Sequence, residues 1–297
     1  MKWKRVQRDG GLRDQRSAGG GLGGGLGGLP MGKMGIPAIL VIVVVVLLGG
    51  GDLLSGGGGG GFDINSPLNQ MPQAQQTGGP QGPDPETNQV DFVNFLRVDI
   101  QDFWQQEFQA AGRSYRNADV TLFRQGVQTG CGGASSAVGP FYCPADQTVY
   151  LDLGFFAELS RRFGAPGDFA QAYVVAHELG HHVQNLLGIE RQVRAEQQQD
   201  PSKQNELSVR MELQADCFAG VWGHSVEQRG MLERGDLEEA LTAAASVGDD
   251  RIQQAANARV DQETWTHGSA EERARWFRAG FDRGDPNACD TFSASSL

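Results

Sequence analysis

Cysteine and positive charge are both scarce in this 297-residue chain, and each shortage excludes a class of function. The four cysteines form no Cys-x-x-Cys pair, which excludes a thiolate zinc site of that type and a thioredoxin-like redox motif. Residues 89–297 carry 18 lysines and arginines against 30 aspartates and glutamates, a net charge of −12. Such a charge repels phosphate backbones, so we expect no nucleic acid among the partners.

The first 88 residues have the composition of a leader and a tether rather than of a folded domain. Residues 1–35 contain seven lysines and arginines against two aspartates, with the run GGGLGGGLGG, and we expect them to be disordered. The stretch 36–54 is apolar without interruption from Pro37 to Gly49, too long for a buried strand, and favours a transmembrane helix. Residues 55–88 are rich in glycine, proline and glutamine, as is typical of a flexible linker.

The charges around the apolar stretch predict its orientation. Basic residues precede it and none follows it closely, so the positive-inside rule places the N-terminus in the cytoplasm. A single-pass membrane protein is then expected, with residues 89–297 outside the cytoplasm, in the periplasm or at the cell exterior. A cleaved signal peptide is the alternative, against which stand the long lead-in and the lack of an Ala-x-Ala site.

All four cysteines lie in the part expected outside the cytoplasm, where disulfides form. Three connectivities are open to four cysteines. We favour the local pair Cys131 with Cys143, which leaves Cys217 with Cys289. Free buried thiols are the alternative.

The segment AHELGHHVQ, residues 176–184, has the His-Glu-x-x-His spacing of a zinc hydrolase. On a helix His177 and His181 lie on one face, with Glu178 one step round, so two imidazoles can bind an ion and a carboxylate can act on its water. His182 points elsewhere. The predicted helix runs from Asp168 to about Leu187, and a glycine inside it, Gly180, suggests that another element approaches closely there.

A catalytic zinc site normally takes three protein ligands. One class of zinc enzymes supplies a further histidine three residues beyond Gly at this motif, but Gln184 and Leu187 stand at the corresponding positions, which excludes that class. The later helical segment NELSVRMELQADCFAGVW offers Glu212 as the third ligand. Asp216, four residues on, shares its edge and is expected to accept the free ring N–H of a ligand histidine. Glu206 and His224 on the same helix are the rival ligands.

The segments that surround these residues resemble the neutral zinc metallopeptidase family of mostly bacterial, membrane-anchored proteins. The resemblance covers about residues 90–292 and rests on six stretches in order: CGGASSAVGPFYCPADQTVYLDL, VVAHELGHHVQNLLG, RMELQADCFAGVW, VGDDRI, THGSAEERARWF and CDTF. It implies a zincin-like fold and peptidase activity with His177, His181 and Glu212 as zinc ligands. The fold class expected is therefore α+β, mainly helical with a small sheet.

The function expected is the zinc-dependent hydrolysis of a peptide or protein substrate, with Glu178 as the general base. His267, just before a predicted helix, is the candidate donor to the developing charge on the carbonyl oxygen, and Tyr150 and Tyr173 are alternatives. A non-catalytic scaffold tethered to the membrane and a zinc hydrolase of non-peptide amides remain open. Manganese or cobalt can replace zinc in the tube.

Three further segments near these residues have a structural and a functional interpretation each. The strand-like QTVYLDL, residues 147–153, is either a sheet edge that binds substrate or an interior strand. The pair Asp249 and Asp250 begins a helix after a turn, or binds a second cation. Arg273 and Trp276 are expected in the scaffold or on the surface rather than at the site.

Overall fold

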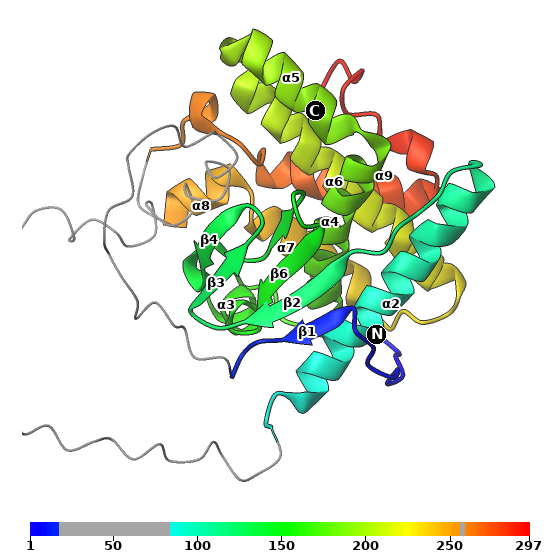
Figure 1. Cartoon of the computed structure of the whole chain (residues 1–297). Helices are drawn as coiled ribbons and strands as arrows, with labels where there is room; N and C mark the ends of the chain where they lie inside the picture. Colours follow the sequence, from blue (N-terminus) through cyan, green and yellow to red (C-terminus); the bar gives the residue numbers. More distant parts are fainter. Residues whose placement is uncertain (18–83, 256–258) are drawn as a thin grey trace, which may run out of the picture.

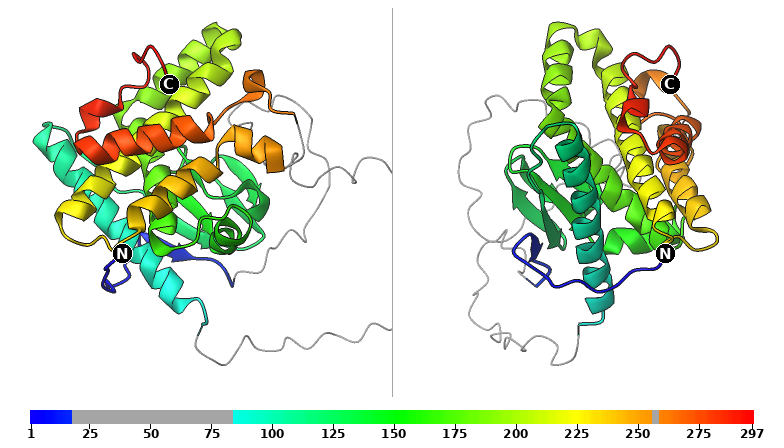
Figure 2. Two further views of the ribbon diagram at one scale, coloured as in Figure 1. Left: turned by 180° about the vertical axis from the view of Figure 1, so that it is seen from behind. Right: turned by 90° about the vertical axis from the view of Figure 1, so that its right-hand side faces the viewer.

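A computed structural model describes residues 1–17, 84–255 and 259–297, and shows the predicted α+β fold, mainly helical with a small sheet (Figure 1). The sheet lies on one side of α2 and α4, and α6, α7 and α9 lie on the other (Figure 2, right). The helices of the described residues are α2 (Thr87–Ala110), α3 (Gly154–Arg161), α4 (Asp168–Leu187), α5 (Ile189–Gln199), α6 (Gln204–Gln228), α7 (Asp236–Ser246), α8 (Asp249–Ala255) and α9 (Ala270–Arg283).

The main sheet has the order β1-β2-β6-β5. Its strands are β1 (Leu12–Asp14), β2 (Asp119–Phe123), β6 (Thr148–Asp152) and β5 (Phe141–Cys143). β1, β2 and β6 are parallel, and β5 runs antiparallel to β6. Every residue of β6 is buried, as suits a strand with neighbours on both sides. The segment QTVYLDL is therefore an interior strand, and β5 forms the edge of the sheet beside α4. A separate hairpin joins β3 (Gly126–Thr129) to β4 (Gly132–Ser135).

Helix α4 has the predicted bounds, and Gly188 ends it with a left-handed φ of 80°. Glycines bring its neighbours very close. A Cβ at Gly180 would lie 3.1 Å from the Ala215 carbonyl oxygen of α6, so the close approach expected at this glycine is confirmed. A Cβ at Gly220 of α6 would overlap the Phe277 carbonyl of α9, and one at Gly280 of α9 would overlap the Cys217 carbonyl of α6. Helices α4, α6 and α9 therefore touch backbone to backbone.

Residues 1–17, here called the N-terminal arm, are ordered, which corrects the expectation of disorder for this part of residues 1–35; residues 18–35 lie outside the described residues. The arm crosses α2 and then adds β1 to the sheet (Figure 1). Its Trp3 ring packs on Phe92, with ring centroids 5.2 Å apart. Arg5 and Arg8 each form a 2.6 Å ion pair with Asp91 of α2. The structured unit thus includes both ends of the chain.

The expected membrane topology is wrong. No helix within residues 1–17, 84–255 and 259–297 has the length and apolar character needed to cross a membrane. The apolar stretch 36–54 and residues 55–83 of the expected linker lie outside the described residues. Because the N-terminal arm packs directly on the domain, the two lie on the same side of any membrane, and a cytoplasmic N-terminus with the domain on the opposite side does not fit the structure.

The structure contains both favoured disulfides, and no cysteine is free. Cys131 is bonded to Cys143, with Cα atoms 5.9 Å apart, and Cys217 to Cys289, with Cα atoms 5.5 Å apart. The first bond ties the β3–β4 hairpin to edge strand β5. The second ties the middle of α6 to the segment after α9.

Candidate metal centre

Helices α4 and α6 bring the three predicted ligands together. The Nε2 atom of His177 lies 3.2 Å from Oε2 of Glu212, and the Nε2 atom of His181 lies 3.4 Å from its Oε1. Zinc with ligands at about 2.0–2.1 Å in a tetrahedron separates those ligands by about 3.3 Å. Two imidazoles and a carboxylate at this spacing fit a catalytic zinc site, and they leave one position of a tetrahedron open.

Each ligand histidine has its other ring nitrogen bonded, which turns Nε2 toward the centre. His177 donates from Nδ1 to Asp216 at 2.8 Å, the partner expected from the sequence. His181 donates from Nδ1 to the Gln184 side-chain oxygen at 2.8 Å, a partner that the sequence had not indicated. Such outer partners select the ring tautomer and raise the basicity of the ligand nitrogen.

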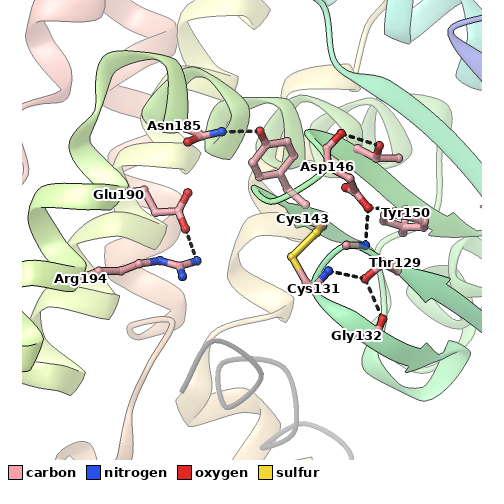
Figure 3. Close-up of a disulfide and its surroundings, with 12 residues drawn as sticks. Thr129, Cys131, Gly132, Cys143, Asp146, Tyr150, Asn185, Glu190 and Arg194 are labelled. Atoms are coloured by element: carbon pink, nitrogen blue, oxygen red, sulfur yellow. Dashed lines mark hydrogen bonds and ion pairs between the residues drawn. A yellow bond between two sulfur atoms is a disulfide. The ribbon is translucent and has the colours of Figure 1, made fainter. Parts of the chain in front are cut away.

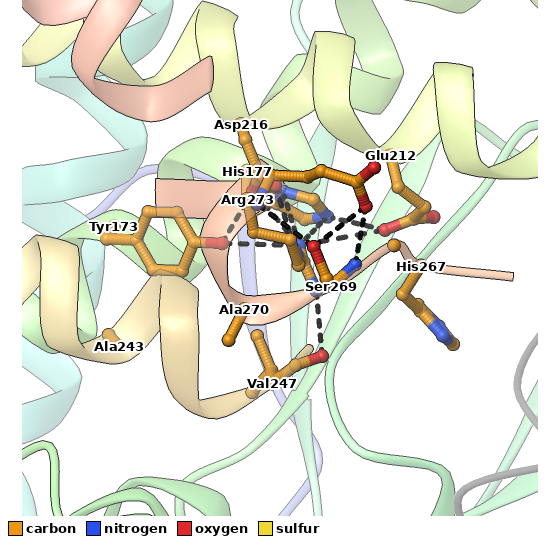
Figure 4. Close-up of polar contacts among 12 residues, drawn as sticks. Tyr173, His177, Glu212, Asp216, Ala243, Val247, His267, Ser269, Ala270 and Arg273 are labelled. Carbon is orange, nitrogen blue, oxygen red and sulfur yellow. Dashed lines mark hydrogen bonds and ion pairs between the residues drawn. The ribbon is translucent and has the colours of Figure 1, made fainter. Parts of the chain in front are cut away.

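Arg273 of α9 also belongs to this centre, which corrects its assignment to the scaffold or surface (Figure 4). Its side chain is only 3% exposed, and its Nε and Nη2 donate to Asp216 at 2.8 and 2.9 Å. The same Nη2 lies 3.7 Å from Glu212. Arg273 shares the spacing of the buried residues Ala270 and Phe277, so the helical pattern of α9 held the signal for its burial.

The pKa values of the two buried acids Asp216 and Glu178 are shifted in opposite directions. Burial would raise the pKa of Asp216, but the charges of Arg273 and His177 and their hydrogen bonds lower it to about 2. Asp216 therefore stays ionised as an acceptor. Burial raises the pKa of Glu178, which is 8% exposed, and the charges of His177 and His181 offset only part of this rise. A carboxylate with a raised pKa is better suited to take up a proton.

His267 lies in a loop next to Glu212, with its ring turned away from the ligands (Figure 4). Asp249 holds this loop by accepting hydrogen bonds from the backbone N–H groups of Thr266, His267 and Gly268 and from Nδ1 of His267, the last at 3.0 Å. Asp250 accepts from the Ala270 N–H at 2.7 Å. The two aspartates thus serve the loop and the start of α9, which explains their pairing without a cation.

The alternatives to His267 are engaged elsewhere. The Tyr173 hydroxyl donates to Asp216 within the buried network, and the Tyr150 hydroxyl of interior strand β6 donates to Asp146 at 2.8 Å. His267 keeps 17% of its side chain exposed. It remains the candidate donor among the three.

Edge strand β5 is hydrogen-bonded to two residues of α4, His182 and Asn185, that follow the ligand His181. The Tyr142 hydroxyl of β5 donates to Nδ1 of His182 at 2.9 Å and accepts from the Asn185 amide at 2.9 Å. Nε2 of His182 donates to the Arg116 carbonyl oxygen at 2.6 Å, so this histidine points away from the centre, as expected. The Cys131–Cys143 bond holds the same strand from its other side (Figure 3).

The rival ligands do not reach the centre. His224 donates to the Phe281 carbonyl oxygen at 2.6 Å, and Glu206 pairs with Arg210 at 2.9 Å.

Comparison with known proteins places these features in a family. The profile described as "Putative neutral zinc metallopeptidase" matches residues 1–292, which includes the N-terminal arm. The "Uncharacterized protein YpfJ" of Escherichia coli K12 is 46% identical over 99% of this chain and 100% of its own length. The "Uncharacterized protein Rv2575" of Mycobacterium tuberculosis is 52% identical over 62% of this chain and 65% of its own. No solved structure matches. The chain belongs to the neutral zinc metallopeptidase family.

Proposed function

We propose that this protein hydrolyses peptide bonds at a zinc ion held by His177, His181 and Glu212. The observation that carries the proposal is the spacing of 3.2 and 3.4 Å between the two Nε2 atoms and the Glu212 oxygens, with Glu178 in the same turn. A family description that names a zinc metallopeptidase supports the same chemistry.

When bound, zinc supplies a Lewis acid and a water molecule whose pKa is lowered to about 7. Glu178 accepts a proton from the attacking water and passes it to the leaving amine. No side chain forms a covalent bond with the substrate. His267 is the donor that we assign to the negative charge developing on the carbonyl oxygen, a role that requires its ring to turn from the orientation in Figure 4 toward the ligands. The contact of Nδ1 with Asp249 at 3.0 Å holds the ring to its loop.

We propose that an extended substrate pairs with the outer edge of β5. Within the described residues this strand pairs with β6 alone, and it lies beside α4. Main-chain hydrogen bonds to a sheet edge align a peptide whatever its sequence. The clamp of Tyr142 on His182 and Asn185 keeps that edge at a constant position relative to the metal ligands.

The test compares the full chain with Glu178→Gln, with Glu196→Gln on α5 as the matched control, because Glu196 pairs with Lys203 on the surface, both side chains being about half exposed. Zinc is measured by elemental analysis and cleavage is followed on an unfolded protein such as casein. We expect about one zinc per chain in all three proteins, and cleavage that Glu178→Gln alone loses by a factor of about 10² or more.

Two results would contradict the proposal. Folded wild-type protein without zinc would refute the ligand assignment. Zinc in all three proteins without cleavage would refute the peptidase assignment and favour a scaffold or a hydrolase of non-peptide amides.

A further inference from the structure

The second ligand histidine is held by a chain of side-chain amides that leads away from the metal centre. His181 donates from Nδ1 to Gln184, one turn further along α4, at 2.8 Å. Gln184 is completely buried, so its amide has no water to turn toward. Where His177 has a carboxylate as its outer partner, His181 has a neutral amide, and an amide can be bound in two opposite orientations.

The orientation of Gln184 is determined by α6. Its Nε2 donates to the Met211 carbonyl oxygen at 2.7 Å and to the Gln214 side-chain oxygen at 3.1 Å. With both donors used on α6, only the oxygen of Gln184 can face His181. A glutamate at this position would place a carboxylate oxygen against the Met211 carbonyl, so the amide is the group that satisfies both sides.

The amide of Gln214 is likewise held in one orientation by hydrogen bonds at both of its ends. Its oxygen accepts from Gln184, and its Nε2 donates to the Cys289 carbonyl oxygen at 2.9 Å. Gln214 is 5% exposed and Cys289 is 1% exposed. The chain of hydrogen bonds therefore has one direction, from the ring N–H of His181 to the backbone at Cys289.

The end of the chain is anchored covalently. Cys217 lies one turn after Gln214 on α6 and is bonded to Cys289. The disulfide and the Gln214 amide thus attach to the same residue from neighbouring positions of one helix. The Cys289 carbonyl oxygen, which accepts the last of these hydrogen bonds, is therefore held at a constant position relative to α6.

We propose that Gln184 and Gln214 are positioning residues for His181, and that the Cys217–Cys289 disulfide anchors them. They keep Nδ1 of His181 protonated and Nε2 turned to the metal. The inference rests on the proposed metal site, and it assigns to this disulfide a role in metal binding in addition to the stability that any disulfide supplies.

The test measures zinc affinity of the full chain by competition with a chelator, and the visible spectrum of the cobalt-loaded protein. The variants are Gln184→Met and Gln214→Met. Gln101→Met is the matched control, since Gln101 of α2 is 1% exposed and bonds the Ala118 backbone rather than any residue of the centre. Gln184→Met should weaken zinc binding about 10- to 100-fold, and Gln214→Met less, with a changed cobalt spectrum. Gln101→Met should lower the melting temperature without altering either readout.

A second pair of variants tests the anchor. Replacing Cys217 and Cys289 together by alanine should weaken zinc binding, whereas replacing Cys131 and Cys143 together should leave zinc affinity within about twofold. Zinc affinities of both glutamine variants within twofold of wild type would refute the positioning role of Gln184 and Gln214 and leave the proposed function intact. A wild type that binds no zinc would refute the proposed function, and the positioning role with it.

Discussion

Removal of the N-terminal arm should destabilise the domain by an amount comparable with its whole free energy of unfolding. Asp91 of α2 is 4% exposed, and its cations Arg5 and Arg8 both come from the arm. A hydrogen bond to a charged group contributes about 1.5–3 kcal/mol, and the lower value applies to each of these two pairs because both arginines are open to solvent, which gives about 3 kcal/mol. The Met1 side chain, completely buried, adds about 1.5–3 kcal/mol of apolar burial.

The sum, about 5 kcal/mol, corresponds to a fall in melting temperature of about 10–20 °C for a domain of this size. The assay is thermal unfolding of the full chain and of residues 18–297, followed by circular dichroism. Lys4→Gln in the full chain is the control, because Lys4 is exposed and changes the arm's charge without touching Asp91.

Asp91→Asn separates the ion pairs from the rest of the arm. In the full chain this change should lower the melting temperature, because it removes two ion pairs. In residues 18–297 it should leave the melting temperature nearly unchanged, because Arg5 and Arg8 are gone and the arm no longer covers Asp91. A truncated protein that melts within about 3 °C of the full chain would refute the reasoning.

Two further predictions concern buried charge. Arg273→Met should lower the free energy of unfolding in urea by about 3–5 kcal/mol, because Asp216 is completely buried and loses its guanidinium partner. Adding Asp216→Asn should recover part of this loss. Equal stability of Arg273→Met and wild type would contradict the prediction. Burial lowers the pKa of His182 to about 4, against about 6.5 when unfolded, so the unfolded chain binds more protons between these values and stability should fall as pH drops from 6.5 to 4, by at most about 3 kcal/mol. His182→Gln should flatten that part of the stability curve, and an unchanged slope would exclude His182 as its source.

The metal centre was largely predictable because its signals are local. His177 and His181 lie four residues apart on one helix, and Glu212 and Asp216 repeat the same spacing on another, so helix geometry alone groups each pair. What brings the two pairs together, the backbone contact at Gly180, left only the hint of a glycine inside a helix.

The features that sequence reasoning missed depend on partners far apart in the chain. The arginines of the N-terminal arm resemble a basic flank until Asp91 is known to lie opposite them, 83 residues later in the case of Arg8. In the sequence Gln184 only marks a position where the glycine of another zinc-enzyme class is absent, because its partners Met211 and Gln214 lie on another helix. Charge and hydrogen-bond partners of this kind have no periodic signature.

The glycine contacts between α4, α6 and α9 have a mechanical consequence. Where two helices touch through their main chains, the distance between them is set by the van der Waals radii of backbone atoms, and no change of side-chain rotamer can alter it. The ligand-bearing helices therefore behave as a stiff frame, and we expect any motion that admits a substrate in the loop that carries His267. Substitutions in the outer core can then accumulate without changing the distances between the metal-ligand atoms.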